Sequence, residues 1–400
     1  MIHILIQLLA VVLLIPAFLI ACYHLLLALV TLFSRKGGSR IVPPKYRFAI
    51  IIPAHDEAGL IAKTVESCRT STYPQEMFEI FVVADNCSDN TAENAEAAGA
   101  TVLNRFDDMA KGKGFALQWA FERLARKAFD AYVILDADCV LDPRALGVFN
   151  DHLAKGAEAL QASYGASNSD ASAISYLLTI SNQIESRLFY FPKSKLGLPI
   201  FLRGTGMVFK KSLLQRVPWS ACSNVEDFEY SIDLIRKGIK VVYLWEILVW
   251  TVFPVNKEQL TVQRSRWAGG SLGLGKRMGL RLIFEGIRKR DLALIDGGWS
   301  LLVLSRPLIL AEMMLATAAC AVAAAWAPGY FSKLLLTAAV VVTALQFAYF
   351  LVPIFMLGLG PSRLLLLLRA PLVIATLIAI SIKAILGTPI ASWDRTPRNL

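Results

Sequence analysis

The sequence predicts an α/β domain built on a parallel sheet and flanked by transmembrane helices. Of the 400 residues, 56% are hydrophobic and only 18% are charged, whereas soluble proteins carry about 25% charged residues. The long apolar stretches lie at the two ends of the chain, and the middle alternates short apolar runs with amphipathic segments. This pattern excludes a disordered or collagen-like chain and indicates membrane spans around a folded domain.

Residues 1–33 contain no Asp, Glu, Lys or Arg, and about 20 apolar residues are enough to cross a bilayer. A cleaved signal peptide is the alternative, but the segment lacks a basic start and its apolar run is too long. Basic residues follow at Arg35, Lys36, Arg40, Lys45 and Arg47. Because basic residues beside a first span mark the cytoplasmic side, we expect the N-terminus outside and the middle of the chain in the cytoplasm.

Residues 47–257 have the pattern of a cytoplasmic α/β domain. Apolar runs predict buried strands at Phe48–Pro53, Ile80–Ala84, Thr101–Leu103 and Tyr132–Leu135, and amphipathic runs predict helices at 58–70, 90–98, 113–128 and 143–154. Such alternation is typical of a parallel sheet. Since ligands bind outside the carboxyl ends of parallel strands, polar residues that follow each strand are the candidate site.

The C-terminal part divides into a basic amphipathic region, 258–296, and an apolar region, 297–390. Basic amphipathic helices usually lie in the membrane interface, although a solvated face is the alternative. The apolar blocks 297–326, 331–358 and 364–387 are candidate transmembrane helices. Three crossings would place Arg395 and Arg398 outside, against the positive-inside rule. One block is therefore expected to be interfacial or re-entrant, and Arg306-Pro307 and Glu312 favour the first.

The net charge of +10 is compatible with nucleic acid, an anionic membrane face or a phosphorylated substrate. Because basic residues gather beside the apolar segments, we expect membrane lipids and a phosphorylated substrate as partners, and no nucleic acid. The six cysteines include no CxxC pair, so neither a disulfide framework nor a zinc site is predicted.

Polar residues follow the first two predicted strands. Asp56 and Glu57 come after the first, and Asp85 ends the second. Carboxylates at adjacent strand ends suit hydrogen bonding to a base and a ribose, although each alone is also an ordinary helix cap. Lys113 lies in Lys-Gly-Lys-Gly at the start of a predicted helix, where backbone amides and a lysine can hold phosphate oxygens. The spacing is not that of a Walker A loop.

The fourth predicted strand ends in Asp136-Ala137-Asp138. Two carboxylates side by side are costly unless a cation neutralises them, and Mg²⁺ or Mn²⁺ prefers carboxylates together with substrate phosphates. Gly204 and Gly206 follow further along the chain, where the backbone either approaches a ligand closely or simply turns.

Glu226 and Asp227 open a predicted helix. Asp227 is either a carboxylate stabilised by the helix dipole or a general base. Gln263, Arg266 and Trp267 lie where the domain meets the basic amphipathic region. Arg266 can bind phosphate, and Trp267 can stack on a sugar ring or anchor at the lipid interface.

The order of these motifs resembles that of membrane-bound family 2 glycosyltransferases. The group includes cellulose, hyaluronan and poly-N-acetylglucosamine synthases and bacterial exopolysaccharide glycosyltransferases. The resemblance covers about residues 47–270 and rests on Asp136-x-Asp138, Glu226-Asp227 and Gln263-x-x-Arg266-Trp267. It implies a GT-A fold with a Rossmann-like mixed sheet, a nucleotide-diphosphate sugar donor, expected to be a UDP-sugar, and Mg²⁺ or Mn²⁺.

The resemblance also implies roles for individual residues. Asp56, Glu57 and Asp85 are expected near the nucleotide, with Asp85 reading the uracil, and Lys113 near the pyrophosphate. Asp136 and Asp138 are expected to hold donor and metal, with Asp138 the direct ligand, and Asp227 to be the catalytic base. Gln263, Arg266, Trp267, Gly204, Gly206 and Glu226 are expected around the acceptor and donor phosphates. Asn86, where a second Asp is common, and Val225, where Thr is usual, depart from the pattern and weaken any inference about the particular sugar.

The expected function is therefore inverting transfer of a sugar to a growing polysaccharide or a lipid-linked acceptor, giving a β-linkage in exopolysaccharide synthesis. The protein is expected to be integral to a bacterial inner membrane with its catalytic domain in the cytoplasm. One alternative is addition of a single sugar to a membrane lipid, namely polyprenyl-phosphate, ceramide or diacylglycerol. A non-enzymatic nucleotide-sugar-binding membrane module is the alternative from a different class.

Overall fold

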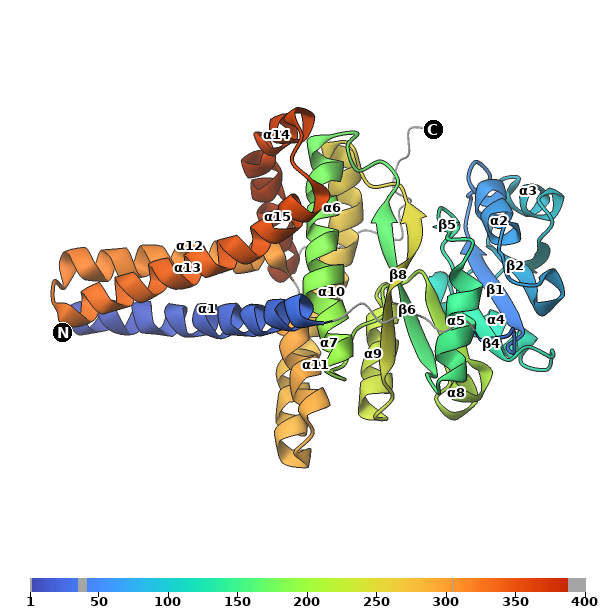
Figure 1. Cartoon of the computed structure of the whole chain (residues 1–400), viewed down its shortest axis with the longest axis horizontal. Helices are drawn as coiled ribbons and strands as arrows, with labels where there is room; N and C mark the ends of the chain where they lie inside the picture. Colours follow the sequence, from blue (N-terminus) through green and yellow to red (C-terminus); the bar gives the residue numbers. More distant parts are fainter. Residues whose placement is uncertain (1, 35–41, 304, 388–400) are drawn as a thin grey trace.

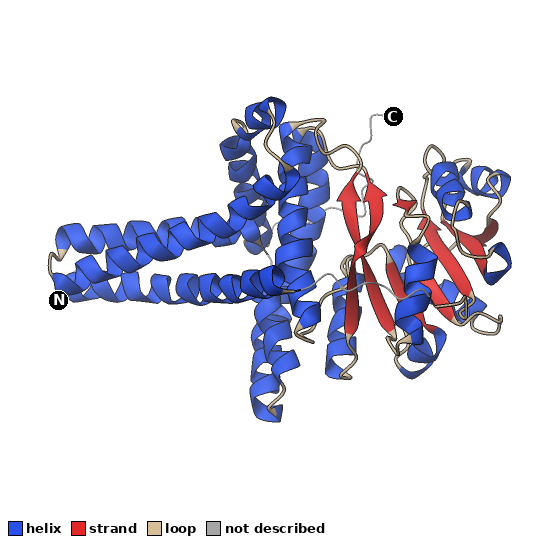
Figure 2. Ribbon diagram, viewed as in Figure 1, coloured by secondary structure: helices blue, strands red, loops and turns tan. Residues whose placement is uncertain are grey.

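The computed structural model describes residues 2–34, 42–303 and 305–387. It consists of an α/β domain joined to a group of long helices, which extends away from it (Figures 1 and 2). Arg35, Lys36 and Arg40, and the tail residues Arg395 and Arg398, lie outside the described residues. The orientation argument based on them therefore remains a prediction.

One eight-stranded sheet runs through the α/β domain in the order β3-β2-β1-β4-β7-β6-β8-β5. The strands are β1 (Phe48–Ala54), β2 (Phe78–Asp85), β3 (Thr101–Arg105), β4 (Ala131–Ile134), β5 (Val140–Leu141), β6 (Ala159–Ala166), β7 (Met207–Lys210) and β8 (Val241–Thr251). The four predicted strands correspond to β1–β4.

The first four strands in chain order form the parallel half of the sheet. Phe48 of β1 pairs with Phe78 of β2 and with Ala131 of β4, and β3 lies parallel to β2. Neighbouring residues of a strand point to opposite faces, so Ile51 and Ile50 of β1 are buried in different core clusters. Both faces are covered, and for this reason the strands read as continuous apolar runs.

The other half of the sheet is mixed, which confirms the mixed sheet that the resemblance implies, whereas strand and helix alternation alone indicates a parallel sheet. Strand β7 is antiparallel to β4 and to β6, and β5 is antiparallel to β8, whereas β8 is parallel to β6. The amide of Gly206 donates to the carbonyl of Ile134 at the carboxyl end of β4. Because β7 starts at that end, it can only run back along β4.

Short helices cover the sheet. The helices are α2 (Ile61–Arg69), α3 (Thr91–Ala97), α4 (Lys113–Leu124), α5 (Ala145–Ala154), α6 (Ala173–Gln183), α7 (Phe191–Lys195), α8 (Lys211–Arg216) and α9 (Glu226–Arg236); a short 3₁₀ turn, η1 (Gln75–Met77), precedes β2, and a π-helical stretch, η2 (Ile184–Tyr190), continues α6. Apolar residues of α2 and α5 share one core cluster, and those of α4 and α9 share the other. The predicted helices at 58–70, 90–98, 113–128 and 143–154 correspond to α2–α5.

Three long helices are apolar and long enough to cross a membrane: α1 (Ile2–Phe33), α12 (Arg306–Trp326) and α13 (Tyr330–Leu357). They run side by side away from the α/β domain, with the N-terminus and the α12–α13 turn at the same far end (Figure 1). Their outward faces expose large apolar side chains such as Leu8, Leu315 and Val341. Such a surface suits lipid and not water.

The last two helices differ from these spans. Helices α14 (Pro361–Leu367) and α15 (Ala370–Ile385) are long and apolar enough to cross a membrane only when taken together, and the pair is bent by 43°. Helix α15 shares a core cluster with α6 and with the start of α10 (Lys257–Lys289). The sequence favours the first apolar block, 297–326, as the one that does not span the membrane. In the structure this block contains the end of α11 (Leu292–Leu302), which packs on α10, and the unbroken helix α12. The bend lies in the third block because Pro361 and Pro371 each restart a helix.

Candidate active site

A cleft of about 520 Å³ opens at the carboxyl ends of β1, β2 and β4, beneath α10, within the usual range for ligand sites. It is lined by the predicted residues Asp56, Glu57, Asp85, Lys113, Asp136, Asp138, Gly204, Glu226, Asp227, Gln263, Arg266 and Trp267. Gly206 instead packs beside Ala162 and Val249 of neighbouring strands. The fold thus brings together residues that are more than 200 positions apart in the chain.

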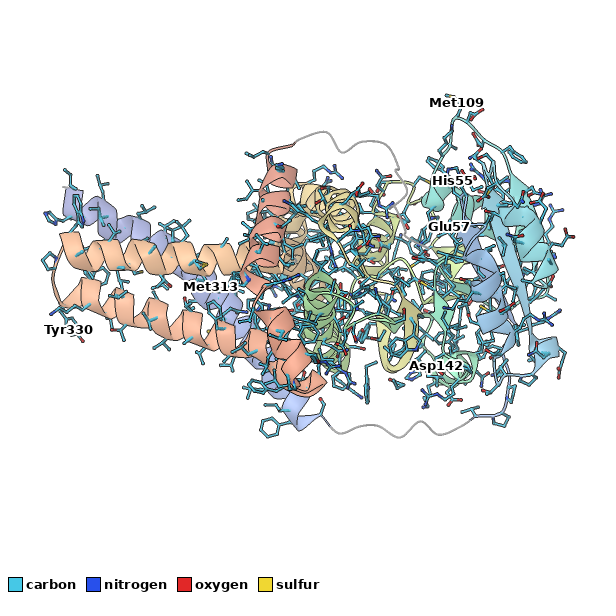
Figure 3. All side chains as sticks on the ribbon, turned by 90° about the horizontal axis from the view of Figure 1, so that it is seen from above. His55, Glu57, Met109, Asp142, Met313 and Tyr330 are labelled. Atoms are coloured by element: carbon cyan, nitrogen blue, oxygen red, sulfur yellow. The ribbon has the colours of Figure 1, made fainter. Side chains whose placement is uncertain are left out.

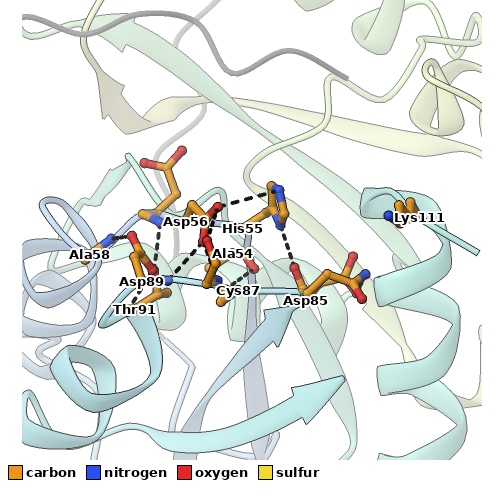
Figure 4. Close-up of polar contacts among 12 residues, drawn as sticks. Ala54, His55, Asp56, Ala58, Asp85, Cys87, Asp89, Thr91 and Lys111 are labelled. Atoms are coloured by element: carbon orange, nitrogen blue, oxygen red, sulfur yellow. Dashed lines mark hydrogen bonds and ion pairs between the residues drawn. The ribbon is translucent and has the colours of Figure 1, made fainter. Parts of the chain in front are cut away.

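The turn after β1 is tied to the turn after β2 (Figure 4). Asp56 has a positive φ of 53°, and its Oδ1 accepts hydrogen bonds from the amides of Ser88 at 2.7 Å and Asp89 at 3.3 Å. Partial burial opposes ionisation, but the Ser88 hydrogen bonds lower the pKa of Asp56 below its usual value. The Asp56 carboxylate therefore holds two walls of the cleft together, and direct contact with a nucleotide stays a prediction.

Glu57 lies in the same turn. Its amide donates to the Thr91 hydroxyl at 2.7 Å, and its carbonyl accepts from the amides of Leu60 and Ile61 at the start of α2. The backbone of Glu57 thus fixes the turn, and its side chain borders the cleft.

Asp85, at the end of β2, is paired with a residue that sequence reasoning missed. Arg105 ends β3 in register with Asp85, and its Nη1 lies 2.5 Å from Asp85 Oδ1. Asn86, with φ 51°, donates to the same oxygen at 3.1 Å. Burial raises the pKa of Asp85, and Arg105 opposes that rise. Arg105 could have been found, because it follows the third predicted strand at the same edge of the sheet.

Lys113 links three parts of the cleft. Its Nζ lies 2.5 Å from Asp136 Oδ1, 2.7 Å from the Gly204 carbonyl oxygen and 3.7 Å from Glu226 Oε1. Burial opposes its charge, but the two carboxylates raise the pKa of Lys113 above its usual value. Gly112, with φ 122°, forms the turn that brings Lys113 to the first position of α4. Lys113 is therefore a fixed positive charge at the centre of the cleft.

Asp136, Asp138 and Cys139 present one ligand atom each within 4.8 Å of one another. Burial raises the pKa of the Cys139 thiol well above its usual value, and the thiol donates to Asp138 Oδ1 at 3.5 Å. A neutral thiol is a poor ligand for a hard cation, so the carboxylate oxygens are the donors. That oxygen set fits Mg²⁺ or Mn²⁺ with substrate oxygens completing the shell.

A second group, Asp56, Cys87 and Asp89, also presents one ligand atom from each residue within 4.8 Å of the others. Its carboxylates already accept hydrogen bonds from the amides of Ser88 and Ala58. Those bonds fix the loop, so the Asp136–Asp138 pair fits a cation better.

Glu226 and Asp227 form the first turn of α9, facing the Gly204 turn. A Cβ added to Gly204, where φ is +77°, would lie 3.3 Å from Lys113 Nζ and 3.6 Å from Asp227 Oδ2. Glycine therefore allows the backbone to approach both groups. Burial raises the pKa of Asp227 well above its usual value, the neighbouring Glu226 charge adds to this, and Lys113 opposes it. A carboxylate held so is suited to accept a proton near neutral pH.

Helix α10 carries Gln263, Arg266 and Trp267 across the top of the cleft. The helix starts at Asn256, whose side chain accepts from the Gln259 amide at 2.9 Å and caps it. Trp267 is 37% exposed, and the Arg264 guanidinium lies 4.9 Å from its ring centre. The indole face is thus oriented at the cleft rim by a cation–π contact.

These observations place a mixed α/β sheet, a pair of carboxylates that fits a divalent cation and a half-buried carboxylate around one cleft. The sequence profile described as "Glycosyltransferase like family 2" matches residues 43–270. The chain belongs to this family, which confirms the resemblance drawn from the motifs.

Individual relatives agree with this assignment. The chain is 24% identical over 237 residues to "Probable glycosyltransferase YdaM" of Bacillus subtilis (strain 168), covering 56% of this chain and 55% of the relative. It is 26% identical over 233 residues to a "Probable glycosyltransferase" of Sulfolobus acidocaldarius, covering 56% and 49%. The chain thus matches about half the length of these curated relatives.

A solved structure shares the fold over nearly the whole chain. It is "Mannosyltransferase PcManGT from Pyrobaculum calidifontis in complex with GDP-Man and Mn2+". The TM-score is 0.62 at 18% identity, covering 95% of this chain and 99% of the other. The likeness confirms a GT-A-like fold with flanking helices.

Proposed function

We propose that this protein is an inverting, divalent-metal-dependent glycosyltransferase. It moves a sugar from a nucleotide-diphosphate sugar, a UDP-sugar in the first instance, to a hydroxyl of a growing polysaccharide or lipid-linked acceptor at the membrane. The product is a β-linkage, and the biological role is exopolysaccharide synthesis. Family membership and the Mn²⁺ and GDP-Man named for the similar solved structure support the donor class and the metal.

One observation carries the proposal: the half-buried Asp227 carboxylate lies beside the Lys113–Asp136 pair in the cleft that α10 also lines. A nucleotide-sugar-binding module needs no base with a raised pKa. A transferase does, because an acceptor hydroxyl must lose its proton as it attacks the anomeric carbon.

Each of these cleft residues has its own role in the proposed reaction. Asp227 accepts the proton of the acceptor hydroxyl, while Lys113 and Arg266 stabilise the charge that grows on the departing diphosphate. Bound to Asp136 and Asp138, Mg²⁺ or Mn²⁺ would neutralise part of the same charge. Trp267 presents an aromatic face to a sugar ring. A single displacement with no enzyme nucleophile inverts the anomeric centre and yields a β-product from an α-donor.

The purified full-length protein in nanodiscs is expected to release nucleoside diphosphate from a nucleotide sugar in the presence of Mn²⁺. The measurement is a panel of UDP- and GDP-hexoses with nucleoside diphosphate release as the readout, and NMR of the transferred sugar gives its anomeric configuration. CMP-linked sugar, which has no diphosphate, is the control and should stay intact. Binding of a donor without turnover would support the binding module instead, and an α-linked product would contradict inversion.

The catalytic domain and the far end of the spans are expected on opposite sides of the membrane. Met109 is 95% exposed at the edge of the α/β domain, and Tyr330, the first residue of α13, is 85% exposed; they lie at opposite ends of the molecule (Figure 3). In a variant whose native cysteines are replaced, Tyr330→Cys should react with a membrane-impermeant maleimide in intact cells. Met109→Cys should react only after lysis.

The two positions are matched, because both side chains are almost fully exposed. Labelling of Met109→Cys in intact cells would place the catalytic domain outside and reverse the proposed topology.

A further inference from the structure

Three arginines that no motif predicts gather at the membrane-facing end of the cleft. Arg203 follows β6 and η2 in the chain and precedes the Gly204 turn, Arg264 lies on α10, and Arg306 opens the membrane helix α12. All three line the cleft, together with Glu185 and Tyr164. We name Arg203, Arg264 and Arg306 the arginine cluster.

Glu185 neutralises only part of this charge. It lies in η2, and its Oε2 is 2.7 Å from Arg203 Nη2 and 3.3 Å from Arg306 Nη2. Burial opposes its ionisation, but Arg203 and Arg306 lower the pKa of Glu185, so it is charged. One carboxylate between three guanidinium groups leaves an excess of two positive charges at the wall of the cleft.

Within the described residues, Arg264 is a member of the cluster with an N–H donor that has no acceptor. Within the described part of the chain, its Nε is shielded from solvent and has no hydrogen-bond partner. A buried charged donor without a partner is costly. Its guanidinium packs 4.9 Å from the Trp267 ring centre, which holds the group in place at the cleft wall. An anion in the cleft would satisfy it.

This end of the cleft is separate from the donor end. Arg264 and Arg266 are two positions apart on α10, so their side chains leave the helix in directions about 160° apart. The Arg266 guanidinium favours the charged form of Glu226, which lies beside Lys113. The Arg264 guanidinium instead interacts electrostatically with Tyr164 and Glu185. Asp227 faces Gly204, the residue after Arg203 in the chain.

We propose that the arginine cluster binds a phosphate group of the acceptor, next to the hydroxyl that is glycosylated. The proposal rests on the proposed function. The guanidinium fork matches phosphate oxygens in pairs, and the position of Arg306 at the start of a membrane helix brings that phosphate to headgroup depth. The acceptor is thus a phosphorylated alcohol, either lipid-bound or free.

The transfer itself leaves that phosphate unchanged. The acceptor oxygen forms a bond to the anomeric carbon, and the bond from that carbon to the donor diphosphate breaks. The proton passes to Asp227, and the nucleoside diphosphate leaves with the bonding electrons. The arginine cluster only positions the acceptor so that its hydroxyl meets Asp227.

The test measures binding, with no need for turnover. Full-length protein is titrated with phosphatidylglycerol and with diacylglycerol by native mass spectrometry, and with sn-glycerol 3-phosphate by calorimetry. The first and third probes carry a phosphate and a hydroxyl, and diacylglycerol carries the hydroxyl alone. We expect at least one phosphate-bearing probe to bind at least about tenfold more tightly than diacylglycerol. Preference for phosphatidylglycerol indicates a lipid acceptor, and preference for glycerol phosphate a soluble one.

Arg264→Gln should weaken binding of that probe at least about tenfold, and Arg264→Lys, which keeps the charge, should weaken it less. Arg281→Gln, at an exposed position of the same helix, is the matched control and should change affinity less than twofold. If Arg264→Gln does not fold, Arg306→Gln serves the same test. Equal binding of diacylglycerol, or unchanged affinity in Arg264→Gln, would overturn the proposal. Nucleotide-sugar binding is measured in parallel, so failure of the proposed function itself is seen separately as loss of donor binding in the wild-type protein.

Discussion

Asp227→Asn is expected to lose at least about a hundredfold in turnover while keeping near-normal affinity for nucleotide sugar and metal. Asparagine has the size of aspartate and still accepts the Phe228 amide hydrogen bond that Asp227 Oδ1 receives at 2.8 Å, but it cannot take up a proton. A carboxylate that only caps a helix contributes about 0.3–1 kcal/mol and would leave the rate intact. Steady-state kinetics together with donor binding by calorimetry separate the two roles.

Asp233→Asn is the matched control, because it makes the same change on the same helix, away from the cleft lining. It should keep wild-type turnover. The pH profile gives a second measurement: a base works when deprotonated, so turnover should rise with pH through the raised pKa of Asp227. The acid limb should lie above the usual carboxyl range. Wild-type turnover in a folded Asp227→Asn enzyme would remove Asp227 from the mechanism and make Glu226 the candidate.

The parallel half of the sheet could be predicted because each strand is buried on both faces. Residues such as Ile50 and Ile51 pack into different clusters, and this leaves a continuous apolar run in the sequence. The antiparallel strand β7 could not be predicted in the same way. Its direction depends on pairing with β4 and β6, which joins residues far apart in the chain.

The donor end of the site could be predicted largely from spacing, because Lys113, Asp136 and Asp227 each follow a recognisable strand end or open a helix. Arg105 follows a predicted strand and could have been found in the same way, but the arginine cluster could not. Its position depends on a partner in another element, Glu185 in η2. Nothing in the local sequence distinguishes Arg264 from the other arginines of α10.

Prediction of the apolar helices from the sequence is limited in the same way by contacts between distant elements. Composition predicts that α1, α12 and α13 are apolar enough to cross a bilayer, since hydropathy is a local property. The bent pair α14–α15 has similar composition, but α15 packs against α10 and α6. Whether an apolar helix spans or lies beside the interface thus depends on packing that hydropathy does not contain.

Asp138→Asn is expected to reduce Mn²⁺ affinity and to lower transfer by about a thousandfold or more, because cation stabilisation of a leaving diphosphate is worth several kcal/mol. Asp136 is already paired with Lys113 at 2.5 Å, so it keeps a counter-charge without a cation. Asp138 accepts hydrogen bonds from the Cys139 thiol at 3.5 Å and the Thr251 hydroxyl at 3.4 Å. Asp138→Asn leaves the Lys113–Asp136 pair in place, so it tests the cation site itself.

The measurement is Mn²⁺ titration in the presence of nucleoside diphosphate, followed by turnover before and after EDTA and on readdition of Mn²⁺ or Mg²⁺. Asp142→Asn is the control: Asp142 lies four positions further on, is paired with Arg144 at 2.8 Å and is not among the residues that line the cleft. It should bind Mn²⁺ and turn over like the wild type. Full activity after EDTA would show that the Asp136–Asp138 pair needs no cation. In that case the positive charge paired with Asp136 would be that of Lys113, and Lys113→Met, rather than Asp138→Asn, would be the change that stops transfer.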